Sequence, residues 1–510
     1  MKRIFLFLLS LWLCFIVNAQ ENIRAYKNPV IPGMAPNPSV CRVNDDYYLV
    51  TSSFNQNPAI PIYHSKDLIN WELINYAVTD KNGLDLSKGE GIFAPTIRYN
   101  EFDSTFYIVA TNRGNGNSFI VYTQHPDSTW SEPVFFANPR VGLYPSLFWD
   151  TDGSCYLQCV DKSSIIQIVI DPKTGEELSS FHYLTDGICP ENPHMYKIGK
   201  YYYLMNTDGC QEIDYHVNIR ISDDIWGPFI PCQHNPILSH NPVLSNDKAK
   251  RDNPIQCTGH ADMIQAHDST WLMVFSATQP FQFTNQPLGR ETFLVPIEWK
   301  DKWPTVNDNV TVPEVVSNEG NTALTSRKGV CELYTFTHIE PLLLEWNAYR
   351  ISPDSVAKIT EDGLEIKASS TYDAFVGIRQ QSYIEDLETK VEIANWEGDA
   401  GICVHNNHDG RYNLALVREN GKAYVELHYL FHSINQTKRI EIDSKTHEIR
   451  LKISSKNDIY EFYYSLDGNS WKSIGSIESS FLLESNSGLL LGPYVEKGSA
   501  TFSYCSFTTK

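Results

Sequence analysis

A short pattern recurs five times in the N-terminal two thirds of the chain. Each copy is a polar turn followed by a strand rich in aromatic and aliphatic residues, and the copies begin at Asn44, Asp103, Asp152, Gly199 and Asp268. The copies are about 50 to 70 residues apart, a length that suits one four-stranded propeller blade. The repeat therefore predicts an all-β fold with a five-bladed β-propeller.

The strand before each turn also begins in a similar way. The five segments read NPSVCRV, APTIRYN, YPSLFWD, NPHMYKI and GHADMIQ, and four of them have a proline in register. This shared register favours a propeller over a β-sandwich with hairpins of similar composition. The innermost strand of a propeller blade starts near the central axis, where a polar pocket is the expected binding site. We expect five positions to meet there: Asn37, Ala94, Tyr144, Glu191-Asn192 and Gly259-His260.

The repeat stops near residue 309. Residues 310–330 are polar and weakly patterned, which indicates a linker. From residue 331 the chain shows many short alternating strands, punctuated by turns such as Asn420-Gly421 and Asp467-Gly468, and this pattern is typical of a β-sandwich. The sequence thus predicts a propeller domain over 27–309, a linker over 310–330 and a C-terminal sandwich over 331–510.

The first 19 residues are typical of a signal peptide. Lys2-Arg3 precedes a long apolar run, and Val17 and Ala19 suit the cleavage site, so we expect an exported protein that is periplasmic or secreted. A lipid anchor at Cys14 is the alternative, although Leu13 is a poor residue to precede it. No later run reaches the roughly 18 apolar residues of a membrane span.

The net charge indicates which partners to expect, and the cysteines indicate whether disulfides or a zinc site are present. A net charge of −20 repels phosphate backbones, so we expect no nucleic-acid partner, and it is compatible with a neutral substrate. Ten cysteines follow the expected signal peptide without any CxxC pair. Most lie in apolar strand patterns, which predicts buried free thiols, at most one disulfide and no zinc site.

Several segments resemble glycoside hydrolase family 43, in the subgroup of β-xylosidases and α-L-arabinofuranosidases that carry a C-terminal β-sandwich. The segments are NPVIPGMAPNPSVCRVNDDYYLVTSSF, IPIYHSKDLINW, GIFAPTIRY, CPENPHMYKIGKYYYL, CTGHADMIQ and GRETFLVPIEWKDKWPTVN. The resemblance implies a five-bladed propeller and hydrolysis with inversion at the anomeric carbon. It also implies an oligosaccharide or polysaccharide side chain as the substrate.

The resemblance assigns three catalytic positions, and this sequence matches only one. An inverting glycosidase needs a carboxylate to deprotonate water and a carboxylic acid to protonate the leaving oxygen, and a nearby anion raises the pKa of the acid. Glu191 matches the general acid, although a carboxylate that only binds hydroxyl groups is the alternative. Asn37 stands where the family has its base aspartate, and Tyr144 stands where it has the aspartate that modulates the pKa.

Neither replacement is a carboxylate. Asn37 cannot take a proton from water but can hold a water or a hydroxyl group. Either it is a positioning residue with the base elsewhere, or catalysis is lost and sugar binding is retained. Tyr144 can donate a hydrogen bond or pack on a sugar face. Four carboxylates are candidates for a substitute base: Asp186, Asp208, Glu212 and Asp214.

Three further residues match substrate-binding positions of the family. Phe93 is expected to line the sugar subsite, with a core aromatic as the alternative. Arg290 is expected to reach substrate hydroxyls, with an ion pair to Glu291 as the alternative. His260 is expected near the channel axis. No cofactor is required, but a calcium or sodium ion in the channel near His260 is compatible with the resemblance. The segment Gly398–Asn407 resembles a loop that walls the active site.

These observations predict an exo-acting glycosidase that releases a terminal pentose. The favoured sugar is α-L-arabinofuranosyl, carried on side chains of plant hemicellulose such as xyloglucan or arabinoxylan. A β-xylosidase is the alternative within the class. A non-catalytic carbohydrate-binding propeller is the alternative outside it, because Asn37 and Tyr144 replace two carboxylates.

Overall fold

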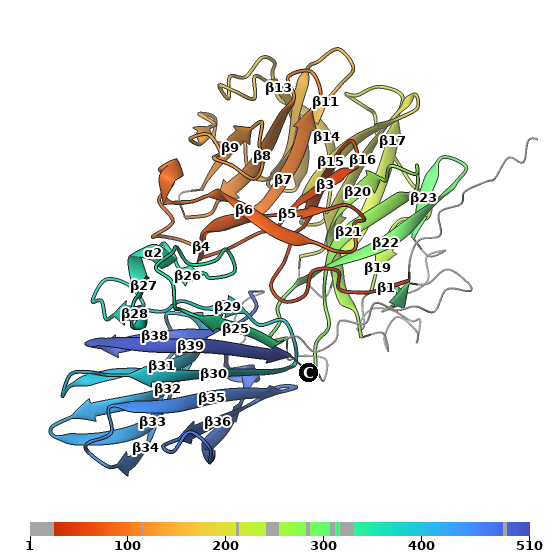
Figure 1. Cartoon of the computed structure of the whole chain (residues 1–510). Helices are drawn as coiled ribbons and strands as arrows, with labels where there is room; N and C mark the ends of the chain where they lie inside the picture. The colour runs from red at the N-terminus through yellow and green to blue at the C-terminus, as the bar shows by residue number, and fades with distance from the viewer. Residues whose placement is uncertain are drawn as a thin grey trace, which may run out of the picture.

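The computed structural model describes residues 25–114, 116–210, 214–240, 254–281, 286–306, 312–313, 315–316, 331–482 and 487–509. The described chain is almost entirely β-structure (Figure 1), which confirms the predicted fold class. The expected signal peptide with Cys14 and most of the expected linker lie outside these residues. In the described part, no helix has the length and apolar character that a membrane-spanning segment needs.

Five antiparallel sheets follow one another along the N-terminal region, residues 25–316. In each, the strands pair in chain order, and the fourth sheet gains β19 (Leu238–Ser239) beside β17. The strands, sheet by sheet, are β2 (Ser39–Val43), β3 (Asp46–Val50), β5 (Ala59–Ser65) and β6 (Glu72–Val78); β7 (Ile92–Asn100), β8 (Thr105–Asn112), β9 (Asn117–Thr123) and β10 (Val134–Phe135); β11 (Leu143–Trp149), β12 (Cys155–Asp161), β13 (Ser164–Ile170) and β14 (His182–Asp186); β15 (Glu191–Ile198), β16 (Tyr201–Asp208), β17 (His216–Ser222) and β18 (Ile230–Pro231); β20 (Gln256–Gln265), β21 (Trp271–Thr278), β22 (Glu291–Lys300) and β23 (Trp303–Val306).

The first strands of these sheets form a closed ring. Each of β2, β7, β11, β15 and β20 contacts the next, and β20 contacts β2. A separate hydrophobic cluster fills each of the five sheet–sheet interfaces. The cluster between the first and fifth sheets, which includes Leu49 and Leu294, closes the circle.

The aligned sequence positions share one backbone feature. Asn37, Ala94, Tyr144, Asn192 and His260 all have a left-handed conformation, with φ of 56°, 40°, 56°, 54° and 46°. The ladders of β7, β11, β15 and β20 shift register at these residues. Such a conformation is unfavourable for residues other than glycine. The repeat in the sequence thus corresponds to the same bulge at the start of successive first strands.

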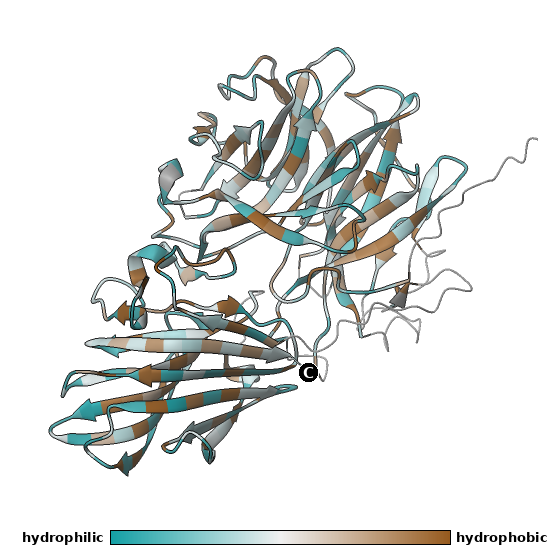
Figure 2. Cartoon of the chain, in the orientation of Figure 1, coloured by the Kyte–Doolittle hydropathy of each residue, from teal (hydrophilic) through white to brown (hydrophobic). Residues whose placement is uncertain are grey.

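The C-terminal region, residues 331–509, consists mainly of two sheets that face each other across one core. Its strands alternate between apolar and polar residues (Figure 2), and both sheets contribute to the core, for example Leu387 and Ile402. One sheet contains β25 (Cys331–Thr335), β27 (Ala357–Thr360), β28 (Gly363–Lys367), β30 (Ile384–Glu392), β35 (Glu448–Lys456), β36 (Ile459–Ser465), β37 (Lys472–Glu478) and β39 (Ser499–Thr509). The other contains β29 (Ile378–Arg379), β31 (Gly398–Asn407), β32 (Gly410–Glu419), β33 (Lys422–Phe431), β34 (Ile434–Ile442) and β38 (Leu490–Lys497). The expected loop Gly398–Asn407 is therefore an internal strand, because its neighbours β32 and β38 pair with both of its edges.

The two regions are joined by backbone pairing. β4 (Gln56–Asn57) pairs with β26 (Ala348–Tyr349), next to the single-turn helix α2 (Pro353–Val356), at the junction seen in Figure 1. Arg379 Nη1 donates to the carbonyl of Met34 at 2.7 Å. The pairing of β4 with β26 and the Arg379 hydrogen bond fix how the two regions face each other. Within the N-terminal region, β1 (Tyr26–Lys27) pairs with β24 (Val315–Val316).

One disulfide is present in the described residues. It joins Cys189 to Cys210 and so ties the segment before β15 to the end of β16. Six of the other eight described cysteines are buried, whereas Cys257 is half-buried and Cys331 is exposed. The expectation of mostly buried thiols with at most one disulfide is confirmed for the described part of the chain.

Candidate active site

Glu191 is the first residue of β15 and lies opposite Thr207 of β16. Its Oε1 accepts a hydrogen bond from the Tyr144 hydroxyl at 2.9 Å, and its Oε2 accepts one from the Tyr215 hydroxyl at 3.0 Å. His260 Nε2 also contacts Oε2. The Glu191 side chain is 13 % exposed, so a ligand can still reach it.

The surroundings of Glu191 decide its charge. Burial raises the pKa of Glu191. Three neighbours lower it: His260 through its charge and hydrogen bond, Arg290 through its charge, and Tyr144 through its hydrogen bond. Their combined effect is larger than that of burial, so the pKa is lowered. Burial and the neighbouring Glu191 raise the pKa of Tyr144 well above its usual value. The ligand-free site therefore favours an ionised Glu191 that accepts from a neutral phenol.

Four of the six expected site residues lie together around this carboxylate: Tyr144, Glu191, His260 and Arg290. The Tyr144 and Tyr215 rings lie 5.6 and 5.8 Å from the His260 ring. The Arg290 guanidinium lies 6.0 Å from the Tyr215 ring. Sequence reasoning missed Tyr215, because it considered only the carboxylates of the segment just before β17.

Asn37 lies two residues before β2, the first strand of the first sheet. Its backbone N–H donates to Ser276 Oγ at 3.1 Å, and its Nδ2 donates to Ser52 Oγ at 3.0 Å. Within the described residues, its buried Oδ1 has no hydrogen-bond partner. The protein thus fixes the amide through its N–H side and leaves the carbonyl oxygen able to accept a hydrogen bond.

Phe93 lies outside the Glu191 group. Its half-buried ring contacts Phe54 at 4.7 Å and lines a cavity between the N-terminal and C-terminal regions. The Arg113 guanidinium lies 5.0 Å from the Phe93 ring, and its charge acts on Tyr144. Phe93 therefore stands on the cavity wall, next to Arg113.

None of the described candidates for a substitute base forms a hydrogen bond with Glu191. Asp186 is exposed and accepts a hydrogen bond from Ser164 at 2.7 Å. Asp208 is buried and accepts from Asn218 Nδ2 at 2.6 Å. Asp214 is half-buried, and Glu212 lies outside the described residues. In the described structure the hydrogen-bond partners of Glu191 are two phenols and an imidazole rather than any of these carboxylates.

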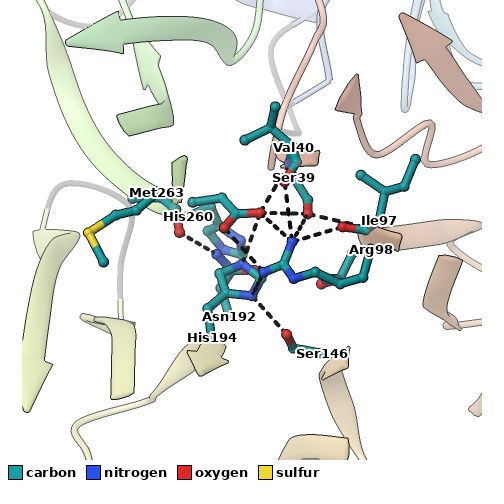
Figure 3. Close-up of polar contacts among 12 residues, drawn as sticks. Ser39, Val40, Ile97, Arg98, Ser146, Asn192, His194, His260 and Met263 are labelled. Carbon is teal, nitrogen blue, oxygen red and sulfur yellow. Dashed lines mark hydrogen bonds and ion pairs between the residues drawn. The ribbon is translucent and has the colours of Figure 1, made fainter. Parts of the chain in front are cut away.

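A second charged group lies within the ring of first strands (Figure 3). Asp262 of β20 forms a buried ion pair with Arg98 of β7, with Arg98 Nη1 2.7 Å from Oδ2. Tyr196 of β15 donates to Asp262 Oδ1 at 2.7 Å, and Ser39 Oγ donates to Oδ2 at 2.7 Å. This network joins the first, second, fourth and fifth sheets.

His194 extends the network to the third sheet. Its Nδ1 accepts from Arg98 Nη2 at 2.9 Å and from Ser146 Oγ at 2.8 Å. Burial lowers the pKa of His194 to about 3, so this ring is a neutral acceptor. Through Arg98 and its partners, all five first strands are therefore connected by hydrogen bonds.

The Asp262 carboxylate of this network is not free to bind a calcium or sodium ion. Both Asp262 oxygens accept from protein N–H or O–H groups. His260 Nε2 is engaged with Glu191, whereas its buried Nδ1 has no hydrogen-bond partner among the described residues. Across the described ranges, no group of three or more His, Cys, Asp or Glu side chains is arranged to hold a metal.

A family model named "Glycosyl hydrolases family 43" matches residues 26–304. The chain belongs to this family. It is therefore a glycosidase, as the sequence predicts. A second model, "Beta xylosidase C-terminal Concanavalin A-like domain", matches residues 335–507. Both matches agree with the resemblance that the motifs carry.

Individual relatives cover nearly the whole chain. A Bacteroides ovatus protein named "Non-reducing end alpha-L-arabinofuranosidase BoGH43B" is 35 % identical over 90 % of this chain and 88 % of its own. A Butyrivibrio fibrisolvens "Xylosidase/arabinosidase" is 28 % identical over 94 % of this chain and 98 % of its own. The solved structure titled "Bacteroides ovatus Xyloglucan PUL GH43B" matches with a TM-score of 0.85 and 31 % identity, and it covers 95 % of this chain and 99 % of that one.

Proposed function

We propose that this family 43 glycosidase is exo-acting and releases terminal α-L-arabinofuranosyl groups from hemicellulose side chains, such as those of xyloglucan or arabinoxylan, with inversion. The observation that carries this proposal is the similarity over nearly the whole chain to a non-reducing end α-L-arabinofuranosidase. The Glu191 group supports it, because it supplies a partly exposed carboxylic group surrounded by hydrogen-bond donors.

The architecture proposed for this activity is a five-bladed β-propeller over 27–309, a linker over 310–330 and a β-sandwich over 331–510. The closed contacts of the five first strands support the propeller. A signal peptide over 1–19 and a periplasmic or secreted location remain proposals that rest on the N-terminal sequence. The disulfide Cys189–Cys210 is compatible with export to an oxidising compartment.

Glu191 is proposed as the general acid. A general acid must carry a proton, whereas the ligand-free site favours the anion. Burial already acts to raise the pKa of Glu191, and a neutral sugar that displaces water adds to this effect. Substrate binding thus shifts Glu191 toward its protonated form, and the acid then protonates the leaving oxygen.

Asn37 and Tyr144 are proposed to position reactants. The free carbonyl oxygen of Asn37 accepts a hydrogen bond from the attacking water and orients it. The proton that this water loses as it bonds to the anomeric carbon passes to solvent water, and Glu191 takes a proton from solvent after the leaving group departs. Tyr144 and Tyr215 hold the Glu191 carboxylate in one orientation. His260 and Arg290 are proposed to bind the pentose hydroxyls beside Glu191, and Phe93 to contact the sugar further out. No metal is assigned a role.

β-Xylosidase activity is the second candidate. It is favoured by the Butyrivibrio fibrisolvens relative, whose name carries both activities. Terminal xylopyranosyl and arabinofuranosyl groups are both neutral pentosides, so the same donors around Glu191 suit either. A panel of p-nitrophenyl pentosides separates the two by the ratio of their kcat/KM values.

The proposal is tested by Glu191→Gln. Loss of the acid is expected to lower kcat about 10²- to 10⁴-fold on an arabinose-bearing oligosaccharide, whose leaving oxygen must be protonated. The loss should be smaller on p-nitrophenyl α-L-arabinofuranoside, because p-nitrophenolate leaves without protonation. The control is Asp186→Asn, since Asp186 is exposed on the edge strand β14. No turnover of any pentoside by the wild-type protein, together with binding of arabinose-bearing oligosaccharides, would instead indicate a non-catalytic binding protein.

A further inference from the structure

A cavity of about 1170 Å³ lies between the N-terminal and C-terminal regions. One wall comes from residues within 53–56 and 87–93, and the other from residues within 349–351, 369–374 and 406–411. Pockets for a single small molecule usually measure about 300–1,000 Å³. The cavity is therefore larger than one pentose requires.

The cavity is preformed, because Arg350 bridges its two walls. The Arg350 backbone N–H donates to the Asn55 carbonyl at 2.7 Å, and its Nη2 donates to the Gly89 carbonyl at 2.6 Å. The adjacent pairing of β4 with β26 adds main-chain bonds between the same regions. A ligand thus meets an ordered site and loses little free energy to closing it.

The wall from the C-terminal region is built around Asp373. Its Oδ1 accepts from His408 Nδ1 at 2.8 Å and from Arg411 Nη1 at 3.1 Å, and its Oδ2 lies 3.4 Å from His405 Nε2. The His405 ring stacks on Phe375, with centroids 4.4 Å apart and planes at 9°. These contacts hold the polar side chains of the wall in fixed orientations.

The lining favours a neutral, hydroxyl-rich ligand. It mixes the rings of Phe93, Tyr349 and Tyr372 with planar polar groups. Sugars present CH faces that pack on aromatic rings and hydroxyl pairs that bind carboxylates, guanidiniums and amides. The charged lining groups are four carboxylates and two guanidiniums, namely Glu90, Asp373, Asp409, Glu496, Arg350 and Arg411. An excess of carboxylates disfavours phosphorylated or acidic ligands.

The cavity adjoins the starts of the first strands. Ser53 lines the cavity and directly follows Ser52, whose hydroxyl accepts a hydrogen bond from Asn37 Nδ2 at 3.0 Å. Phe93 also lines the cavity, and the next residue, Ala94, donates its backbone N–H to the same hydroxyl at 2.8 Å. The cavity wall therefore lies next to two of the five aligned positions, Asn37 and Ala94.

The geometry points to this cavity as a binding site for several sugar residues of a neutral β-linked oligosaccharide, the main-chain segment that carries the released pentose. The inference rests on the proposed function for the identity of that pentose. Tyr372 and His408 act as binding residues for the main chain, while the chemistry stays with the Glu191 group. The enzyme would then recognise the substrate on the leaving-group side as well as at the pentose.

Binding is tested by calorimetry with cellotetraose and xylotetraose, using the Glu191→Gln protein to prevent turnover. Tyr372→Ala in that background is expected to weaken binding roughly fivefold or more. His408→Ala is the second variant, since its ring is 67 % exposed and folding should tolerate the change. Tyr183→Ala is the matched control, because Tyr183 is 54 % exposed on the outer strand β14.

The outcomes separate the two proposals. Binding of cellotetraose that Tyr372→Ala weakens supports a glucan main chain, and the same result with xylotetraose supports a xylan. No binding of either, or equal binding by Tyr372→Ala and Tyr183→Ala, overturns the inference. Turnover of p-nitrophenyl α-L-arabinofuranoside by the wild-type protein is measured separately. Its absence contradicts the proposed function, while the tetrasaccharide titrations still test the cavity.

Discussion

Asp262 and Glu191 are carboxylates on contacting first strands, β20 and β15, and each has a pKa below its usual value. Their partners differ. Asp262 is fully buried and pairs with the guanidinium of Arg98, a permanent cation. Glu191 is partly exposed, and its partners are two phenols and an imidazole.

This difference separates a structural carboxylate from a chemically usable one. Burial raises the pKa of Asp262, but the charge and hydrogen bonds of Arg98 and the hydrogen bond of Tyr196 bring it down to about 2, so Asp262 stays an anion across the physiological range. The hydrogen-bond partners of Glu191 can themselves exchange protons, and a bound ligand can change the solvation of the Glu191 carboxylate. A low pKa alone therefore does not mark an active site, whereas the nature and accessibility of the partners do.

The largest effect is expected from Arg98→Met. Because it leaves Asp262 buried without its cation, it should reduce the free energy of unfolding by about 3–5 kcal/mol, measured by urea denaturation. Arg140→Met is the control, since Arg140 pairs with Asp161 at the surface and should cost at most about 1 kcal/mol. Dialysis against a chelator should leave stability unchanged. Equal losses for the two variants, or a loss on chelation, would contradict the role given to Arg98.

A smaller effect is expected from Asn37→Asp. A carboxylate at this position supplies the base that the family has there, so kcat on p-nitrophenyl α-L-arabinofuranoside should rise at least about 10-fold, within the usual range of general-base catalysis. Asn37→Ala is the control and should lower kcat, because it removes the amide that orients water. A fall in kcat for Asn37→Asp would show that the amide has its own role.

The smallest effect is expected from Tyr144→Phe. The Tyr144 hydroxyl lowers the pKa of Glu191, so its removal raises that pKa. A general acid is active when protonated, and activity falls as pH rises through its pKa. The basic limb of the kcat/KM profile should therefore move to higher pH, by less than about 1 unit. Tyr215→Phe should move it in the same direction. A shift to lower pH would mean that Glu191 does not act as the acid.

Much of the fold follows from the sequence because the repeat is local. The turn and proline positions set the start of each first strand, and four of the five aligned segments keep the proline. The all-β class and the family are confirmed. The extent of strand β31 was missed, since the segment Gly398–Asn407 contains glycine and polar residues that resemble a loop, while its pairing with β32 and β38 depends on distant sequence.

The site was only partly visible in the sequence. Glu191, Tyr144 and His260 meet because they occupy equivalent positions in a repeat, whereas Arg290 was predicted only through the family resemblance. Tyr215 stands outside the aligned segments. Arg98 and Asp262 lie within two of them, but their contact forms only once sheets far apart in sequence are brought together. Phe93 lies on the cavity wall because the C-terminal region completes that surface, which a motif in the N-terminal region cannot indicate.

The left-handed backbone at Asn37 has a consequence for evolution. Asparagine and aspartate are the side chains that this conformation tolerates best after glycine, so amide and carboxylate can replace each other there without moving the chain. Substitution at this one residue during evolution can therefore change the hydrolase activity while the fold stays the same.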